Sequence, residues 1–116
     1  MKISEKMHDS VAVLTLSGEL MSGPEVAPFQ DHVKKLANDG VHNVVVDFSK
    51  VRWFGSAMLG VLTASLTTLR GEGGDLRLTG VTKKIESILM VTQLANIFKT
   101  LDSVDAAVAS FGTGDA

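Results

Sequence analysis

Residues 47–70, DFSKVRWFGSAMLGVLTASLTTLR, decide the fold of this 116-residue chain. The segment starts on the last polar residue of an apolar run, VVVDF, passes through a turn with the single tryptophan and enters a predicted helix at Ser56. No charged residue stands between Arg52 and Arg70, although 21% of the chain is charged. A helix without charge is either buried on every side or keeps one face for a partner.

The elements around this segment alternate between strands and helices. Apolar alternation and turn residues predict a hairpin from strands at residues 2–7 and 11–16. Helical periodicity predicts helices at 22–40, 56–70, 83–92 and after 103, interleaved with strands at 43–48, 75–79 and 97–101. The predicted apolar stripes of the last two helices are Ile85, Ile88 and Leu89, and Val104, Ala107, Val108 and Phe111. This order predicts an α/β domain with a mostly parallel sheet. Because 43–48 is almost continuously apolar, we expect that strand to be covered on both faces.

The sequence also predicts where the helices begin and end. Ser22 or Gly23 is expected to cap the first helix, and Pro24 suits its first turn. Pro28 removes a helical donor, so we expect it to bend that turn or delay the regular helix by a few residues. The glycines of residues 71–74 follow a helix and precede a strand, which predicts a helix end and a turn.

Composition limits the functions open to the chain. Its length fits one domain, assigned here to residues 1–111, followed by a flexible tail at 112–116. There is no cysteine, so neither a disulfide nor a thiolate metal site is available. The net charge is −2 and the sequence has no basic stripe, which argues against direct nucleic-acid binding. No apolar run is long enough to insert into a membrane, and the N-terminus lacks the apolar core of a signal peptide. We therefore expect a cytoplasmic protein.

Catalytic and metal sites find little support in the sequence. Ser56 stands where a hydrolase places its nucleophile, but FGSAM at residues 54–58 lacks the second glycine of that motif. All three histidines precede Ser56 and are scattered, without metal-ligand spacing. The glycine-rich segment 71–74 is on the wrong side of a helix for a phosphate loop. The sequence therefore predicts a non-enzymatic protein with no cofactor and no metal.

The helix at 56–70 divides into two faces on a helical wheel. The predicted core stripe is Leu59, Leu62, Leu66 and Leu69, with Met58 at its edge, and the opposite face is Ser56, Gly60, Thr63, Thr67 and Arg70. That second face is small and hydroxyl-bearing instead of charged, and a mid-helix glycine costs about 1 kcal/mol relative to alanine. Close approach of another surface explains this choice. The surface belongs either to a partner or to a second helix of this chain.

Ser56 itself has two interpretations. Serine at the start of a helix is commonly an N-cap. Alternatively it is a phosphorylation site, because a phosphate there would meet the positive end of the helix dipole and bring about −1.5 to −2 charges to a neutral face.

Several of these motifs together resemble a known family. They are GEL at 18–20, VVVDFSKVRWFGSAMLGVL at 44–62, LRGEGGDLRLTGV at 69–81, LANIF at 94–98 and DSVDAAVASF at 102–111. The chain resembles a STAS domain over nearly its whole length, and more narrowly the bacterial anti-sigma factor antagonists. The resemblance implies one STAS domain with a mixed sheet of four or five strands and about four helices packed mainly on one face.

The resemblance also implies a mechanism of partner switching. The unmodified antagonist binds an anti-sigma factor that is also a serine kinase, and phosphorylation of a serine at the start of the central helix separates them until a phosphatase restores the serine. In this chain that serine is Ser56, and Leu59 and Gly60 match the end of the family motif. Gly55 and Met21 replace two acidic residues of the family, and Met58 replaces a glycine. The switch then uses a different kinase, or the domain is never phosphorylated.

These inferences define a predicted docking surface around Ser56. Its other members are Met21, Ser22, Trp53, Gly55, Ala57, Met58, Gly60 and Thr63. Trp53 fits either a partner contact or the edge of the core. Two alternatives to the antagonist remain: an unphosphorylated STAS accessory subunit of a transporter or other complex, and a domain that binds a nucleotide or small ligand. The oligomeric state is not decided by the sequence.

Overall fold

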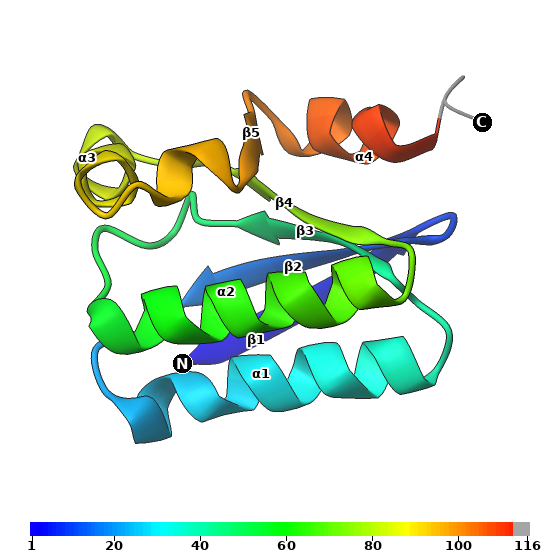
Figure 1. The fold of residues 1–116 in the computed structure, drawn as a ribbon, viewed down its shortest axis with the longest axis horizontal. Coiled ribbons are helices and arrows are strands. Elements are labelled where there is room, and N and C mark those ends of the chain that lie inside the picture. The colour runs from blue at the N-terminus through cyan, green and yellow to red at the C-terminus, as the bar shows by residue number, and fades with distance from the viewer. Residues whose placement is uncertain (113–116) are drawn as a thin grey trace.

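A five-stranded mixed sheet forms the centre of the structure, a computed structural model in which residues 1–112 are described (Figure 1). The strand order is β1-β2-β3-β4-β5; β1 is antiparallel to β2, and the other neighbours are parallel. In chain order the elements are β1 (Lys2–His8), β2 (Val11–Ser17), α1 (Gly23–Asn38), β3 (Asn43–Asp47), α2 (Ser56–Gly71), β4 (Asp75–Thr79), α3 (Lys83–Val91), the short 3-10 helix η1 (Leu94–Asn96), β5 (Lys99–Leu101) and α4 (Val104–Gly112). The predicted order of elements is confirmed. Gly112, assigned to the tail, ends α4, and the rest of that tail lies outside the described residues.

Strand β3 is covered on both faces. Val44 and Val46 belong to the main core, which α1 and α2 close from one side of the sheet. Val45 points the other way and packs with Ala107 of α4. Figure 1 shows α1 and α2 on one side of the sheet and α4 on the other. The two-sided burial predicted from the apolar run is therefore confirmed. The family resemblance implies helices mainly on one face of the sheet, and α4 is the exception to this, because it covers the other face.

The last two helices follow their predicted apolar stripes. In α3, Ile85 and Leu89 are buried in the core shared with α1 and α2. In α4, the inward residues Val104, Ala107, Val108 and Phe111 pack with Val11, Val13 and Val45. Arg77 of β4 contacts α4 in two ways. Its guanidinium lies 4.1 Å from the centre of the Phe111 ring, and it donates a hydrogen bond to the carbonyl of Ser110 at 2.6 Å.

A capping box begins α1. The hydroxyl of Ser22 accepts the N–H of Glu25 at 3.4 Å, and the Glu25 carboxylate accepts the N–H of Ser22 at 2.9 Å and of Met21 at 3.0 Å. The helix runs regularly from Gly23, so the predicted delay by Pro28 is wrong. The reason is that Pro28 lies close to the helix start. The carbonyl that it leaves without a helical donor belongs to Pro24 in the first turn, and both prolines are exposed, so that carbonyl is not in the core.

The turn after α2 requires glycine. Gly73 has φ +86°, and Gly74 lies against the main chain of His42, where an added Cβ would stand 1.8 Å from the carbonyl oxygen. Gly74 also donates its N–H to the carbonyl of Leu69, so it closes the end of α2. The predicted helix end is confirmed.

Replacing Gly74 by alanine is expected to lower the free energy of unfolding by at least about 1–3 kcal/mol, the typical cost of forcing atoms into a filled space. Urea unfolding monitored by circular dichroism measures it. Gly71→Ala is the control, since a Cβ there meets nothing within 4 Å. Equal midpoints for the two variants would contradict the close contact.

The capping carboxylate makes stability depend on pH. Main-chain N–H bonds from Ser22 and Met21 hold the pKa of Glu25 below its ordinary value of 4.5. A lowered folded-state pKa means that the ionised form stabilises the fold above about pH 4.5 and that this contribution is lost as pH falls through the folded-state pKa.

Glu25→Gln is therefore expected to flatten the fall in unfolding free energy between roughly pH 5 and pH 3. Urea midpoints measured across that range test it. Asp31→Asn, at an exposed position of the same helix, should leave the slope as in the wild type. A slope unchanged by Glu25→Gln would contradict the capping role.

Candidate partner-docking site

Ser56 is the first residue of α2 and not its cap. The N-cap is Gly55, in extended backbone geometry, and no side chain caps the helix. The N-cap interpretation of Ser56 is therefore wrong. Ser56 is exposed, and its hydroxyl has no hydrogen-bond partner among residues 1–112. Among residues 1–112 the N–H of Met58 donates to the carbonyl of Gly55, whereas the N–H groups of Ser56 and Ala57 have no partner. Two free main-chain donors and a free hydroxyl therefore lie together at the start of α2.

Two loops meet at the start of α2. Gly55 donates its N–H to the carbonyl of Leu20 at 3.1 Å, and an added Cβ at Gly55 would stand 2.8 Å from the carbonyl oxygen of Met21. The loop after β2 therefore lies directly on Gly55. An aspartate at position 55, which the antagonist motif would place there, does not fit unless the main chain at Met21 moves.

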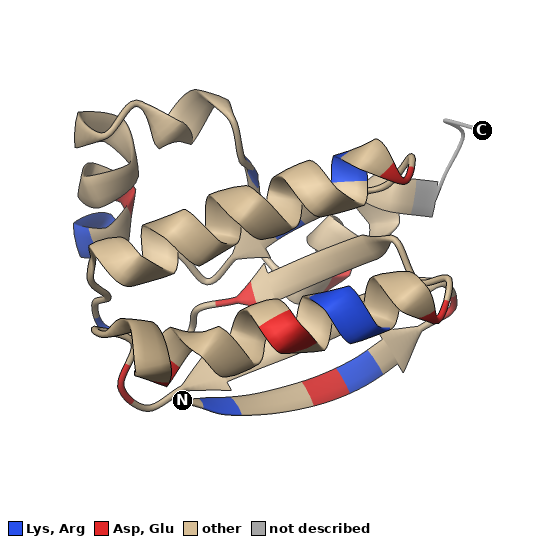
Figure 2. Ribbon diagram, turned by 60° about the horizontal axis from the view of Figure 1, so that its bottom comes forward, with Lys and Arg blue, Asp and Glu red and all other residues tan. Residues whose placement is uncertain are grey.

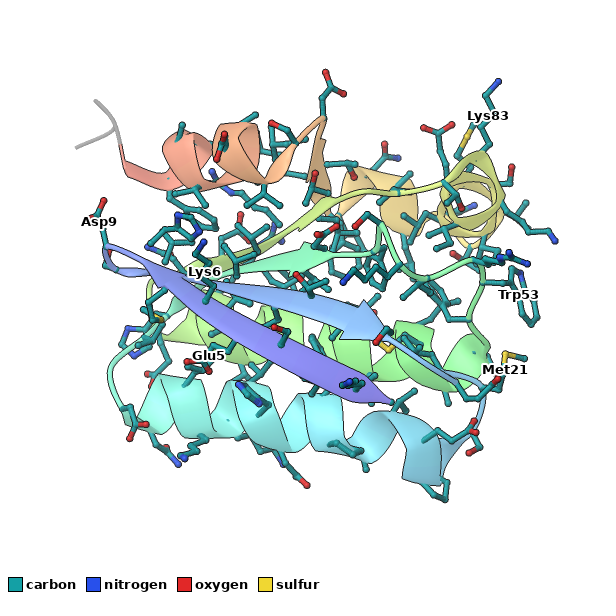
Figure 3. All side chains as sticks on the ribbon, turned by 180° about the vertical axis from the view of Figure 1, so that it is seen from behind. Glu5, Lys6, Asp9, Met21, Trp53 and Lys83 are labelled. Atoms are coloured by element: carbon teal, nitrogen blue, oxygen red, sulfur yellow. The ribbon has the colours of Figure 1, made fainter. Side chains whose placement is uncertain are left out.

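Met21 and Trp53 expose apolar surface at this end of the molecule. They are 43% and 44% exposed, and neither belongs to the two apolar clusters of the described residues. Figure 3 shows both side chains at the same end of the molecule, beyond the end of the sheet. The aromatic rings buried beside this turn are those of Phe48 and Phe54, with ring centres 5.5 Å apart, whereas Trp53 is exposed.

The faces of α2 differ from the helical wheel by a small rotation. Met58 is 0% exposed in the centre of the core, whereas Leu59 is only partly buried. The prediction for Met58 is wrong, because it lies in the core instead of at its edge and cannot contact a partner. Leu59 packs against the core as predicted, but at its margin. A wheel gives the relative directions of side chains, but the sheet determines which direction is its centre, and here Met58 and Leu62 occupy it. Ala57 stays on the surface as a half-buried residue.

The threonine hydroxyls of α2 are bonded to the main chain of their own helix. Thr63 donates its hydroxyl to the carbonyl of Leu59 at 2.9 Å, and Thr67 and Thr68 make the same bond four residues back, each at 3.0 Å. A Cβ at Gly60 would meet nothing within 4 Å, so no second helix of the described chain packs there. Of the two surfaces predicted to approach Gly60, the second helix is therefore excluded among residues 1–112, and approach by a partner stays a prediction.

This face carries little charge. Figure 2 shows α2 without a charged residue until Arg70, near its C-terminal end. The carboxylate of Glu25 lies beside Met21, and it accepts hydrogen bonds from the main-chain N–H groups of Met21 and Ser22. The members of the docking surface are therefore all uncharged, with Met21 and Trp53 as its exposed anchors, and the exposed charges nearest to these two in the chain are Glu19 and Arg52.

Other kinds of site receive no support within the described chain. Residues 1–112 contain no group of three His, Asp or Glu side chains placed to hold a metal ion. His32 pairs with Glu5 at 2.6 Å, and His42 lies 3.9 Å from Glu72, each at a partly exposed position. None of the described helices has the length and hydropathy needed to cross a bilayer.

Known proteins share this fold. A candidate anti-sigma factor antagonist of Thermotoga maritima is 26% identical with a TM-score of 0.87, covering 94% of this chain and 93% of that one. The anti-sigma factor antagonist SpoIIAA from Bacillus, at 14% identity, aligns in its unphosphorylated form with a TM-score of 0.81 over 94% of this chain and 95% of that one. A sulfate transporter family protein of Wolinella succinogenes, also 14% identical, gives 0.72 over 90% and 87%.

The two matches at 14% identity concern the fold alone. The sequence of the chain itself matches the family described as "Mlab, STAS domain" over residues 3–108, which is nearly all of the described structure. The chain belongs to the STAS domain family.

Proposed function

We propose that this STAS domain is an anti-sigma factor antagonist whose docking surface binds an anti-sigma factor with serine kinase activity. Phosphorylation of Ser56 ends the binding, and a phosphatase restores it. The observation that carries the proposal is the exposed, unpaired hydroxyl of Ser56 in the middle of a neutral surface. The similarity to the candidate antagonist of Thermotoga maritima supports it. The activity is binding, and no catalytic role is assigned to the domain.

A phosphate on Ser56 would be compatible with the fold. It would lie at the positive end of the α2 dipole, where no side chain occupies the free N–H groups. No acidic residue stands in the first turn to repel it. The modification therefore leaves the helix intact while it adds about −1.5 to −2 charges to a surface that binds through apolar contacts.

The partner surface is expected to be apolar opposite Met21 and Trp53. Both side chains are nearly half exposed. Aromatic and methionine side chains are enriched in the buried central part of protein–protein interfaces. The acidic residues that family members carry at positions 21 and 55 are absent, so ion pairs at those positions do not contribute. Gly60 allows the partner main chain to approach α2 closely.

A second candidate function is a binding module that is never phosphorylated, such as an accessory subunit of a transporter or other multi-protein complex. The contact between Gly55 and Met21 favours it, because the loop fills the space of the acidic residue next to the family's phosphorylated serine. The two candidates share the docking surface and differ in whether Ser56 is modified.

Ser56→Asp is expected to weaken partner binding at least tenfold with little change in the unfolding midpoint, because the new charge enters a neutral interface. Ser56→Ala should stay bound in the presence of kinase and ATP. Affinity measurements with the purified partner, together with intact mass and site mapping after incubation with the kinase, test both.

Each result separates the candidates. Phosphate incorporation at Ser56 with release of the partner supports the antagonist. Binding without phosphate incorporation supports the accessory subunit. Tight binding by Ser56→Asp, or release of Ser56→Ala as fast as wild type, would rule out the switch at this residue.

Gly60→Gln is expected to raise the free energy of unfolding by roughly 0.5–1 kcal/mol, since glutamine is the better helix former at an open position. The same change should weaken partner binding tenfold or more by blocking close approach. Thr68→Gln, exposed on the same helix but outside the docking surface, is the matched control and should bind as the wild type does. Equal affinities for the two variants would contradict docking on this face.

A further inference from the structure

A polar pocket lies on the face of the sheet opposite to α1 and α2. Its volume is about 220 Å³, and its lining residues are Lys2, Ser4, Thr15, Ser17 and Lys50. All five have side chains that can donate a hydrogen bond, two of them are cationic, and none is acidic. This pocket does not contain Ser56 or any other residue of the proposed docking surface.

Strand register explains why these side chains converge. Lys2 pairs with Ser17 and Ser4 pairs with Thr15 across the antiparallel β1–β2 ladder, so the four side chains share one face of the sheet. Val11 and Val13 precede them on that face of β2 and are covered by α4. Helix α4 does not reach the end of β2, and from valine to Thr15 and Ser17 the strand changes from apolar to hydroxyl-bearing.

The polar groups of the pocket have no partners among residues 1–112. Neither ammonium group is within ion-pair distance of a carboxylate, and none of the three hydroxyls makes a hydrogen bond. Asp47 of β3 is an acidic residue next to the pocket, because it is paired with Thr15 across the β2–β3 ladder. It is nearly buried, and its Oδ1 accepts the N–H of Ser49 at 2.9 Å.

We propose that this pocket binds a small phosphate-class anion, either inorganic phosphate or a small phosphomonoester. Two ammonium groups can neutralise a dianion, and three hydroxyls can donate to its remaining oxygens. The volume is below the roughly 300–1,000 Å³ of pockets for drug-sized ligands, which favours a small anion over a nucleotide.

The pocket joins the two segments that lead to the docking surface. Lys50 belongs to the loop that continues to Trp53 and Gly55, and Ser17 ends β2 just before the loop that carries Met21. A bound anion therefore ties β1, the end of β2 and the loop before α2 to one another. The inference does not rest on the proposed function, because it concerns other residues and needs no protein partner.

Titration calorimetry and thermal unfolding of the full chain with inorganic phosphate, glycerol 3-phosphate or chloride at matched ionic strength test the proposal. We expect a concentration-dependent rise in Tm with a phosphate compound and none with chloride. The double variant Lys2→Gln/Lys50→Gln should bind at least tenfold more weakly. Lys34→Gln/Lys84→Gln removes the same charge from exposed positions outside the pocket and should bind as the wild type does.

The comparison of the two ligands identifies the source of the phosphate group: tighter binding of glycerol 3-phosphate indicates an ester, and tighter binding of inorganic phosphate indicates the free ion. Thr15→Val with Ser17→Ala removes two hydroxyls without a charge change and should also weaken binding. Equal Tm shifts with phosphate and chloride, or equal losses in the two lysine double variants, would show a general charge effect and overturn the proposal.

Discussion

The main-chain hydrogen bond from Gly55 to the carbonyl of Leu20 is the contact on which the candidate site depends. It joins the loop after β2 to the start of α2, two segments that are far apart in the chain. Because Gly55 has no side chain, Met21 can lie against it, and the apolar side chains of Met21 and Trp53 come to the same end of the molecule. A single backbone approach thus combines a free helix N-terminus, an exposed serine and two apolar anchors into one surface.

Patterns of apolar residues made most of the fold predictable. The VVV run of β3 indicated a strand with two covered faces, since three consecutive valines between Asn43 and Asp47 place apolar side chains on both faces. The stripes of α3 and α4 were correct because short helices with three or four apolar residues leave only one way to face a sheet. The position of Ser56 at the start of a helix also followed from the sequence, and its exposure agrees with that prediction.

The errors came from features that only packing decides. The rotation of α2 exchanged Met58 and Leu59, because both are apolar and the wheel does not contain the direction of the sheet. The hydroxyls of Thr63 and Thr67 are on the predicted face but donate to carbonyls four residues back, a local bond that the helical wheel does not show. Gly55 as the cap, and the loop resting on it, depend on a long-range backbone contact that local sequence does not report.

The placement of α4 also has a consequence for how the chain reaches this structure. Val11, Val13 and Val45 are buried by residues near the other end of the sequence, so one face of the sheet stays open until nearly the whole chain is present. Contacts with such long sequence separation form late and slow the search for the native state. During synthesis the uncovered valines of β2 and β3 form an apolar strip with an affinity for other chains, and α4 acts as its protection against aggregation.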